Sequence, residues 1–251
     1  MDQPLVSVIT PVLNARASID GVIRTVMEQS YPHVEHIIID GGSEDGSVEV
    51  IKDHEKRLAY WVSEKDEGIY DAMNKGIDAA GGEWIYFLGA DDRFYNKDVL
   101  SSLFDERPTP KTVSIIIAKV ILPNGKQFKC RFNGSIIFKN TLHHQGVFYR
   151  KTVFEGYRYG MIDDNTFKHY KISGDYDLNL KLYYDGAEFI AADTVVAKCG
   201  DGISLEGRLS GYLEEILIRH RYVRTPGRIF FDMLTALRFF YKKAIRRRIL
   251  V

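Results

Sequence analysis

The stretch at residues 63–92, SEKDEGIYDAMNKGIDAAGGEWIYFLGADD, decides the fold of this 251-residue chain. From Ile69 to Ala80 its apolar residues recur at spacings of three and one, which predicts a helix with one apolar face. Gly81 and Gly82 then end the helix, and the apolar run Trp84–Leu88 predicts a short buried strand. A helix that leads through a tight turn into a buried strand is typical of βαβ units, and it indicates a mostly parallel sheet.

The residues before this stretch repeat the same alternation. Leu5–Thr10, Glu35–Asp40 and Tyr60–Ser63 predict three more strands. Helices are expected between them, one from Ser18 to about Gln29 and one from the Gly41-Gly42 turn to about Lys56. Ligands of such sheets bind beyond the carboxyl ends of the strands, so the candidate site lies in the loops at these ends. These loops are Pro11–Asn14, Asp40–Ser43 and Gly89–Asp92.

After residue 92 the pattern changes, which predicts a mixed and partly antiparallel second half. Residues 113–122 and 126–132 flank Pro123-Asn124-Gly125, a sequence that favours a hairpin turn. A short strand is expected at 146–149 and a helix at 175–184. No Pro- or Ser-rich linker separates the two halves, so we expect them to share one core.

The composition is that of an ordinary globular protein, with 45% hydrophobic and 27% charged residues. Its two cysteines, Cys130 and Cys199, lie far apart and outside any CxxC motif, so reduced thiols are expected rather than a disulfide. No signal peptide is expected, because Asp2 opens the chain and the first apolar run is short. Nor does any run reach the roughly 18 apolar residues that a spanning helix needs.

Acidic residues gather at the predicted strand ends. Asp91 and Asp92 are adjacent, and two such carboxylates repel each other unless a cation is bound. Mg²⁺ and Mn²⁺ prefer oxygen ligands and typically take one or two carboxylates together with substrate phosphates; a solvated turn is the alternative. Asp40 either accepts hydrogen bonds from a base or ribose or caps the turn that follows it. Asp175 and Asp177 begin a predicted helix, where capping is the commoner role.

The segments SVITPVLNA, IIIDGGSEDGS, the 63–92 stretch, HHQGVFY and SGDYDLNLKLY, in this order and spacing, resemble glycosyltransferase family 2. The resemblance covers roughly residues 5–202, and within the family the chain looks most like small enzymes that build bacterial exopolysaccharide repeat units, including the colanic acid type. It implies the GT-A fold, a Rossmann-like α/β fold with a mostly parallel central sheet and helices on both faces. The implied domain is 1–207, with a nucleotide-sugar-binding half at 1–95 and an acceptor and catalytic-base half at 96–207. A C-terminal basic amphipathic helical region follows at 208–251.

The resemblance also implies the roles of individual residues. Asp175 matches the catalytic base, and Asp91 and Asp92 match the acids that hold a divalent cation, Mn²⁺ or Mg²⁺. His144 and Gln145 match an element that contacts the acceptor or the diphosphate; a buried, hydrogen-bonded core histidine is the alternative for His144. The residues matched to nucleotide-sugar binding are Thr10, Pro11, Asn14, Asp40, Asp66, Gly68, Lys75 and Asp91.

The chain departs from the usual family pattern at three residues. Gly89 replaces the first acid of D-x-D-D, Met73 replaces an arginine that can bind phosphate, and Gly174 replaces the first acid of a Glu-Asp pair. Asp175 is thereby left alone as the base candidate. The chain also lacks the Q-x-x-R-W motif of processive synthases, so we expect single additions of sugar.

The reaction that the resemblance implies is an inverting, metal-dependent transfer of a sugar from a nucleoside-diphosphate sugar to an acceptor hydroxyl. A lipid-linked oligosaccharide of bacterial surface polysaccharide synthesis is the expected acceptor. Two alternatives remain open at this point. A nucleotidyltransferase would share the sheet and the metal, although residues 11–15 (PVLNA) are not its Gly-rich phosphate loop. A catalytically weakened transferase scaffold that acts as a membrane-associated partner would account for Gly89, Met73 and Gly174.

The C-terminal segment is strongly basic, with ten Lys and Arg residues against one acid from Arg219 onward, while the rest of the chain has an excess of acids. A helix is predicted at 229–251, and its polar stripe is Asp232, Thr235, Arg238, Lys242 and Arg246. Aromatic and aliphatic residues cover much of the remainder, which favours an interfacial helix on an anionic membrane. We therefore expect a cytoplasmic protein held peripherally on the inner face of the plasma membrane. Packing against the acidic body and homo-oligomerisation are the alternatives, and nucleic acid is not an expected partner.

Overall fold

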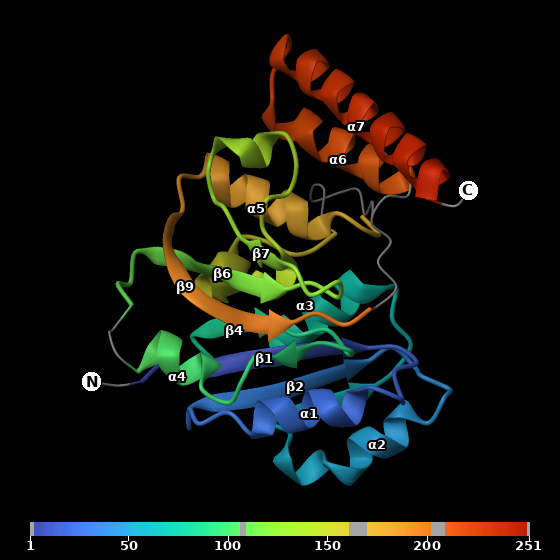
Figure 1. Ribbon diagram of the computed structural model, residues 1–251. Coiled ribbons are helices and arrows are strands. Elements are labelled where there is room, and N and C mark those ends of the chain that lie inside the picture. Colours follow the sequence, from blue (N-terminus) through green and yellow to red (C-terminus); the bar gives the residue numbers. More distant parts are fainter. Residues whose placement is uncertain (1–2, 106–108, 161–169, 202–208, 250–251) are drawn as a thin grey trace.

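The computed structural model describes residues 3–105, 109–160, 170–201 and 209–249, without the side chains of 245–249. Helices and strands alternate through the first half, and the chain ends in two helices (Figure 1). The elements are β1 Val6–Val12, α1 Ile19–Met27, β2 Val34–Asp40, α2 Ser47–Asp53, η1 Glu55–Arg57, β3 Tyr60–Ser63, α3 Ile69–Ala79, β4 Trp84–Phe87, β5 Arg93–Phe94, α4 Val99–Phe104, β6 Val113–Ile121, β7 Gln127–Lys129, η2 Gly134–Ile137, η3 His144–Gly146, β8 Val147–Arg150, η4 Lys151–Glu155, α5 Gly174–Tyr184, β9 Glu188–Lys198, α6 Leu209–Tyr222 and α7 Gly227–Ile249.

The first half forms the predicted parallel sheet. β1 pairs in parallel with β2 on one side and β4 on the other, and β2 pairs in parallel with β3. β1 lies between β2 and β4 and is buried except at Pro11, with Val8 facing one hydrophobic core and Ile9 facing the other. α1 contributes to the first core and α3 to the second, so helices cover both faces as expected. A strand buried on both faces reads as a continuous apolar run, which is why β1 and β4 are recognisable in the sequence.

The second half extends the same sheet in mixed directions. In the described residues the strand order is β3-β2-β1-β4-β8-β6-β9-β5, with β7 beside β6. β8 runs antiparallel to both β4 and β6, whereas β9 runs parallel to β6. The parallel pairing expected of the first half is confirmed for β1 to β4, and the mixed, partly antiparallel second half is confirmed beyond β4. The predicted hairpin exists as β6 and β7, although β7 ends at Lys129, three residues earlier than expected.

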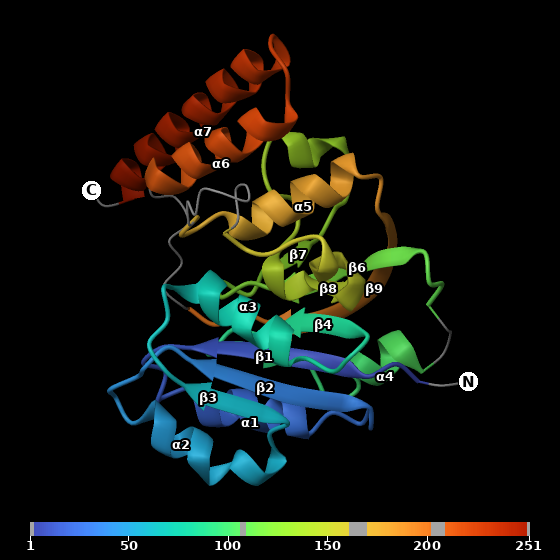
Figure 2. The same ribbon diagram turned by 180° about the vertical axis from the view of Figure 1, so that it is seen from behind.

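The two C-terminal helices stand on the second half. α6 packs on α5, and α7 packs on α6, so the pair lies at the end of the molecule opposite α1 and α2 (Figures 1 and 2). The expected boundary at 207/208 falls outside the described residues. In the described part of the chain, every helix is too short or too polar to cross a lipid bilayer.

Candidate active site

The loops that follow β1 and β2 meet at the carboxyl ends of these strands, as predicted. The Asn14 backbone N–H donates to the Ser43 hydroxyl over 2.7 Å, and the Asn14 side-chain oxygen accepts from the Glu44 N–H over 3.0 Å. Asn14 has a φ of 51°, in the left-handed region that asparagine tolerates better than most residues. Pro11, half-buried on β1, leads into this loop. One edge of the candidate site is therefore formed by two loops that hydrogen-bond each other.

Asp40 holds the loop after β2 in place through its hydrogen bonds. It is fully buried, and its carboxylate accepts from the N–H groups of Gly42 and Ser43 and from the hydroxyls of Ser43 and Ser63. Of the two roles considered for Asp40, this geometry supports turn capping. Thr10 is also fully buried, and its hydroxyl hydrogen-bonds His36 at 3.0 Å. Both side chains are buried, so Asp40 holds the loop after β2 and Thr10 links β1 to β2.

The loop before α3 forms the neighbouring edge. Asp66 accepts from the Gly68 N–H at 2.9 Å, and its other carboxylate oxygen lies against Gly41, where a side chain would collide with it. Gly68 has a φ of 123°, a conformation open to glycine. Lys75 reaches back from α3 to ion-pair with Glu64 and Asp71, and the Glu64 hydrogen bond is the main reason that its pKa is raised. Lys75 thus braces the loop.

The acidic pair after β4 divides into two environments. Asp92 is buried and accepts from the Gly89 N–H at 3.0 Å and the Gly200 N–H at 2.9 Å. Burial raises the pKa of Asp92 despite these hydrogen bonds. Asp91 is half-buried, and its carboxylate lies against the backbone of Gly200. Asp92 therefore fixes the loop, and Asp91 is the better-placed acid for a ligand.

A divalent cation at this loop would need ligands from the substrate as well as from the protein. Within the described ranges, no three or more His, Cys, Asp or Glu side chains are grouped so that they could hold a metal by themselves. A hard cation that shares its coordination with substrate phosphates needs one or two carboxylates only. Asp91 fits that requirement, because it stands at the carboxyl end of β4 where nucleotides bind in such sheets.

Gly89 and Gln145 complete this loop. A side chain at Gly89 would come within 2.5 Å of the Asp92 carboxylate, so the position of the missing acid is taken by Asp92 itself. The Gln145 amide lies against the same loop and hydrogen-bonds Asp92. The Tyr86 hydroxyl donates to the Gln145 carbonyl at 2.8 Å, which anchors η3 to β4. Gln145 is thereby brought to the acidic loop.

His144 points into an aromatic layer. Its ring stacks on Phe87, with 5.0 Å between the centroids, and Tyr159 approaches its edge at 6.4 Å. Both ring nitrogens are shielded from solvent, and neither has a hydrogen-bond partner among the described residues. Burial lowers the pKa of His144 to about 3, so the ring is neutral. His144 is thus half-buried as a residue with shielded ring nitrogens, and it lacks the hydrogen bond that the core-histidine alternative required.

Asp175 and Asp177, two residues apart, have different partners. The Asp177 carboxylate is buried and accepts two hydrogen bonds from Arg221, at 2.7 and 2.9 Å, and one from the Tyr222 hydroxyl. Asp175 is half-buried at the start of α5 and accepts from the Asn140 amide at 2.8 Å. The structure thus assigns Asp177 to a structural ion pair, and Asp175 remains the candidate base.

A continuous aromatic layer connects Asp175 to the acidic loop. Phe87, at the end of β4, contacts Tyr159 at 5.8 Å, and Tyr159 stacks on Tyr70 at 5.3 Å. The Tyr70 ring fills the space beside Gly174, where a side chain would approach it to 2.8 Å, and its hydroxyl accepts from the Gly174 N–H. Tyr70 therefore takes the place of the missing first acid. The wall between the acidic loop and Asp175 is apolar.

Two contributors to the site were missed from the sequence. Asn140 holds the Asp175 carboxylate, and Glu214 of α6 accepts from three consecutive backbone N–H groups at Lys171, Ile172 and Ser173, at 2.8–3.0 Å. Asn140 stands three residues before the HHQG element, a position that could have drawn attention. Nothing near Glu214 in the sequence points to α5, because the contact depends on how α6 packs.

Curated relatives were found for most of the chain. A PGL/p-HBAD biosynthesis glycosyltransferase of Mycobacterium tuberculosis is 29% identical over 195 residues, which cover 74% of this chain and 73% of the relative. A protein named as a teichuronic acid biosynthesis glycosyltransferase, TuaG of Bacillus subtilis, is 41% identical over 101 residues, which cover 39% of this chain and 40% of the relative.

Solved structures share the fold at low sequence identity. The structure of S. aureus TarS 1-349 in complex with UDP-GlcNAc superposes with a TM-score of 0.68 at 17% identity, over 94% of this chain and 73% of that one. This chain covers 39% of the longer TarS chain. The mannosyltransferase PcManGT of Pyrobaculum calidifontis, in complex with GDP-Man and Mn²⁺, gives 0.65 at 17% identity, over 95% of this chain and 70% of that one.

The family model named Glycosyl transferase family 2 matches residues 7–168. That match includes the loops after β1, β2 and β4, the start of α3 and the HHQG element. It spans more than half of the chain, and the fold and the loop geometry agree with it. The chain is a glycosyltransferase and belongs to glycosyltransferase family 2.

Proposed function

We propose that this glycosyltransferase moves a single sugar, with inversion, from a nucleoside-diphosphate sugar to an acceptor hydroxyl, with Asp175 as the base. The observation that carries the proposal is the contrast between Asp175 and Asp177. Asp177 is engaged in an ion pair with Arg221, whereas the Asp175 carboxylate accepts a hydrogen bond from the neutral Asn140 amide. Asp175 lies at one end of the aromatic layer that begins at the acidic loop. The Asn140 amide thus orients the Asp175 carboxylate, and a general base must be oriented toward the proton that it takes.

The donor would bind at the carboxyl ends of β1, β2 and β4. Pro11 and Asn14 border the nucleotide on one side, and Asp66 and Gly68 border it on the other. A divalent cation, Mn²⁺ or Mg²⁺, would neutralise the charge that develops on the leaving diphosphate. Asp91 would hold it, and Asp92 keeps the loop in place through Gly89 and Gly200. The complexes of TarS with UDP-GlcNAc and of PcManGT with GDP-Man and Mn²⁺ support this choice of ligands.

The acceptor hydroxyl would approach from the second half of the chain, where Asp175 begins α5. Asp175 takes its proton as the oxygen attacks the anomeric carbon, and the nucleoside diphosphate departs on the opposite face. A positioned base of this kind gives roughly 10²–10⁴-fold in rate. Tyr70, Tyr159 and Phe87 are packed in the core between the acidic loop and α5, and they would keep bulk water away from that side of the site.

We further propose a lipid-linked acceptor, met at the inner face of the plasma membrane. Relatives named for PGL/p-HBAD and for teichuronic acid biosynthesis support a role in making surface glycolipids or polysaccharides. The basic C-terminal region supports a peripheral position on an anionic surface. Residues 1–95 would then serve the donor, and residues 96–207 would serve the acceptor.

The alternative of a weakened scaffold receives no support from the departures that suggested it. Gly89 and Gly174 each make room for another side chain, Asp92 and Tyr70 respectively, and Met73 is buried in the core beneath α3. These substitutions belong to a consistent local packing. A nucleotidyltransferase is likewise not supported, because the relatives and the family are glycosyltransferases.

The test is the substitution Asp175→Asn, assayed with a panel of nucleotide sugars and Mn²⁺ for transfer and for hydrolysis to the nucleoside diphosphate. Nucleotide binding should stay near the wild-type value, while turnover should fall by about 10²-fold or more. Asp185→Asn, at the other end of α5, is the matched control, because Asp185 forms an exposed ion pair with Lys181. Wild-type turnover in Asp175→Asn would exclude Asp175 as the base.

A further inference from the structure

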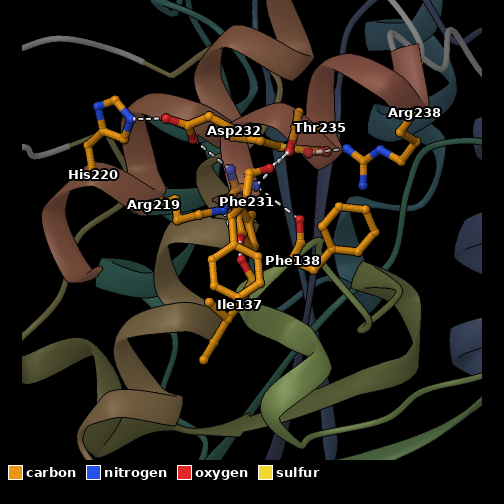
Figure 3. Close-up of polar contacts among 10 residues, drawn as sticks. Ile137, Phe138, Arg219, His220, Phe231, Asp232, Thr235 and Arg238 are labelled. Carbon is orange, nitrogen blue, oxygen red and sulfur yellow. Dashed lines mark hydrogen bonds and ion pairs between the residues drawn. The ribbon is translucent and has the colours of Figure 1, made fainter. Parts of the chain in front are cut away.

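α7 turns its polar side toward the protein. Arg219 of α6 is fully buried, and its guanidinium donates to Asp232 and Thr235 of α7, each at 3.0 Å (Figure 3). The same guanidinium donates to the carbonyls of Ile137 and Phe138 at 2.9 Å, which ties α7 to η2 through α6. The polar stripe predicted from the sequence is therefore an inward face, at least over its first three members.

Two further contacts fix this orientation. His220 of α6 hydrogen-bonds Asp232 at 2.6 Å, and Arg238 of α7 forms an ion pair with Glu215 of α6. A rotation of α7 would leave the buried Arg219 without its partners, and an unpaired buried charge is costly. The helix is thus held with its polar stripe inward.

The opposite face of α7 is apolar and lies in solvent. Its large side chains are 56–68% exposed: Ile229, Phe230, Met233, Leu237, Phe240 and Tyr241. They recur at spacings of three and four, so they form one continuous face. A surface helix normally shows the reverse arrangement, and an exposed apolar surface of this extent marks an interaction site. α6 adds a second exposed stripe at Leu209, Leu213 and Leu217.

The charges beside this face identify its partner. Residues 233–251 contain six Lys and Arg and no acid. Lys242 and Lys243 are exposed, and Asp232, the one acid of α7, is occupied by Arg219 and His220. A second copy of the chain would bring the same basic end against this one without a facing acid. An anionic bilayer offers apolar depth and negative charge together.

We infer that α7 docks on an anionic lipid bilayer through the face made by Phe230, Met233, Leu237 and Phe240. In this orientation α6 and α5 lie toward the bilayer, and α1 and α2 lie at the far end of the molecule (Figures 1 and 2). The inference rests on the proposed function only in that a lipid-linked acceptor would reach Asp175 from the same side. The docking face itself follows from the packing of α7.

The experiment is flotation of the full chain with vesicles of phosphatidylcholine alone or mixed with phosphatidylglycerol. The test variant replaces Phe230, Met233, Leu237 and Phe240 with serine. Wild type should bind the anionic vesicles, bind neutral ones weakly and dissociate as salt is raised. The variant loses four apolar side chains from the docking face, so it should bind at least about tenfold more weakly. Tyr60→Ser with Tyr95→Ser, exposed aromatics outside the α6–α7 pair, is the control and should bind normally.

Two readouts keep the outcomes separate. Circular dichroism should show that the serine variant remains folded, and its hydrolysis of nucleotide sugar in solution should equal that of wild type. If the wild-type protein does not hydrolyse nucleotide sugars, that result contradicts the proposed function but not docking. Docking is overturned if the wild-type protein does not bind anionic vesicles, or if the serine variant binds them as tightly as wild type. It is also overturned if wild type binds neutral vesicles as tightly as anionic ones. A wild-type dimer that the substitutions dissociate, with no vesicle binding, would assign the face to a second copy.

Discussion

The Asn140 amide and the Tyr176 N–H both help to orient the Asp175 carboxylate. Asn140 donates to Asp175 at 2.8 Å, while its own oxygen accepts from the Leu142 N–H and the Asn179 amide, so it cannot flip without losing both. Asn140→Asp would replace this donor with a like charge, which disfavours the ionised base. We expect turnover at neutral pH to fall about tenfold or more and to recover as pH rises, because the acid limb of the pH–rate profile moves upward.

The control for this variant is Asn133→Asp in the same segment. Asn133 caps η2 by accepting from the Ser135 N–H, a role that a carboxylate can also fill, so its pH–rate profile should match that of wild type. An Asn140→Asp profile that is lowered equally at every pH would indicate a structural defect rather than a changed base.

His144 makes a prediction about stability. Burial holds its pKa at about 3, below the usual 6.5, so it contributes stability that is complete above about pH 6.5 and is lost as pH falls toward 3. One such proton changes the free energy of unfolding by about 1.4 kcal/mol per pH unit. His144→Phe should keep the ring on Phe87 and remove this contribution. Urea titrations between pH 4.5 and 7 should show a shallower dependence in the variant.

A second buried histidine provides an internal reference for this measurement. His36 is also buried with a pKa of about 3 and remains in the variant as an internal reference, so the pH dependence should be reduced and not abolished. Parallel stability curves for the variant and wild type would show that His144 takes up no proton on unfolding.

Single residues were hard to assign from the sequence where two acids stand close together. Asp91 and Asp92 carry no signal that separates the buried loop anchor from the half-buried candidate ligand, because Gly200, which binds Asp92, lies far away in the chain. Asp175 was separated from Asp177 by the family resemblance alone. The structural reason, Arg221, comes from α6.

At the scale of elements, α6 holds the segment that leads into α5. Glu214 accepts from three consecutive N–H groups, which requires both oxygens to be acceptors. Glu214→Gln turns one oxygen into a donor that faces backbone donors. We expect the free energy of unfolding to fall by about 1–3 kcal/mol. Turnover should fall with it, because Asp175 lies only two residues after Ser173. Thermal unfolding and nucleotide-sugar hydrolysis would measure both effects.

Glu49→Gln is the matched control, because Glu49 is exposed on α2 at the other end of the molecule. It should change neither the melting temperature nor the turnover. If Glu214→Gln leaves hydrolysis intact while it lowers stability, the α6 contact supports the fold and does not position the base.

Elements were predictable where periodicity and burial agree. β1, β2, β4, α1 and α3 bury the residues that their spacing selects, and their bounds agree with expectation to within about three residues. β9 was not predicted, because more than half of its residues are exposed and its middle is Ala-Ala-Asp. The helix of α7 was predicted but its orientation was not, since periodicity shows which residues share a face and not which face is covered.

At the scale of the whole molecule, a single sheet joins the first half of the chain to the second, and α6 joins the second half to α7. This coupling limits what a truncation can show. Removal of residues 228–251 would expose the apolar contacts of α6 and leave the fully buried Arg219 without Asp232 and Thr235. The carbonyls of Ile137 and Phe138, close to Asn140 in the chain, would lose a fixed donor. A truncated chain would therefore lose membrane binding and catalytic geometry together.

A point substitution separates the two. Asp232→Asn leaves the outward face of α7 unchanged but removes the charge that pairs with Arg219, so stability should fall by about 2 kcal/mol while binding to anionic vesicles persists. Asp20→Asn is the matched control, because Asp20 also pairs with one arginine and one histidine, Arg24 and His54. Its Arg24 pair is exposed, so its loss should destabilise the protein less than the loss of the Asp232 pair. Denaturant unfolding of the two variants compares a buried ion pair with an exposed one of the same composition. Equal stability in both would mean that the buried network does not hold α7 in place, and the outward face would then have no fixed orientation from which to dock.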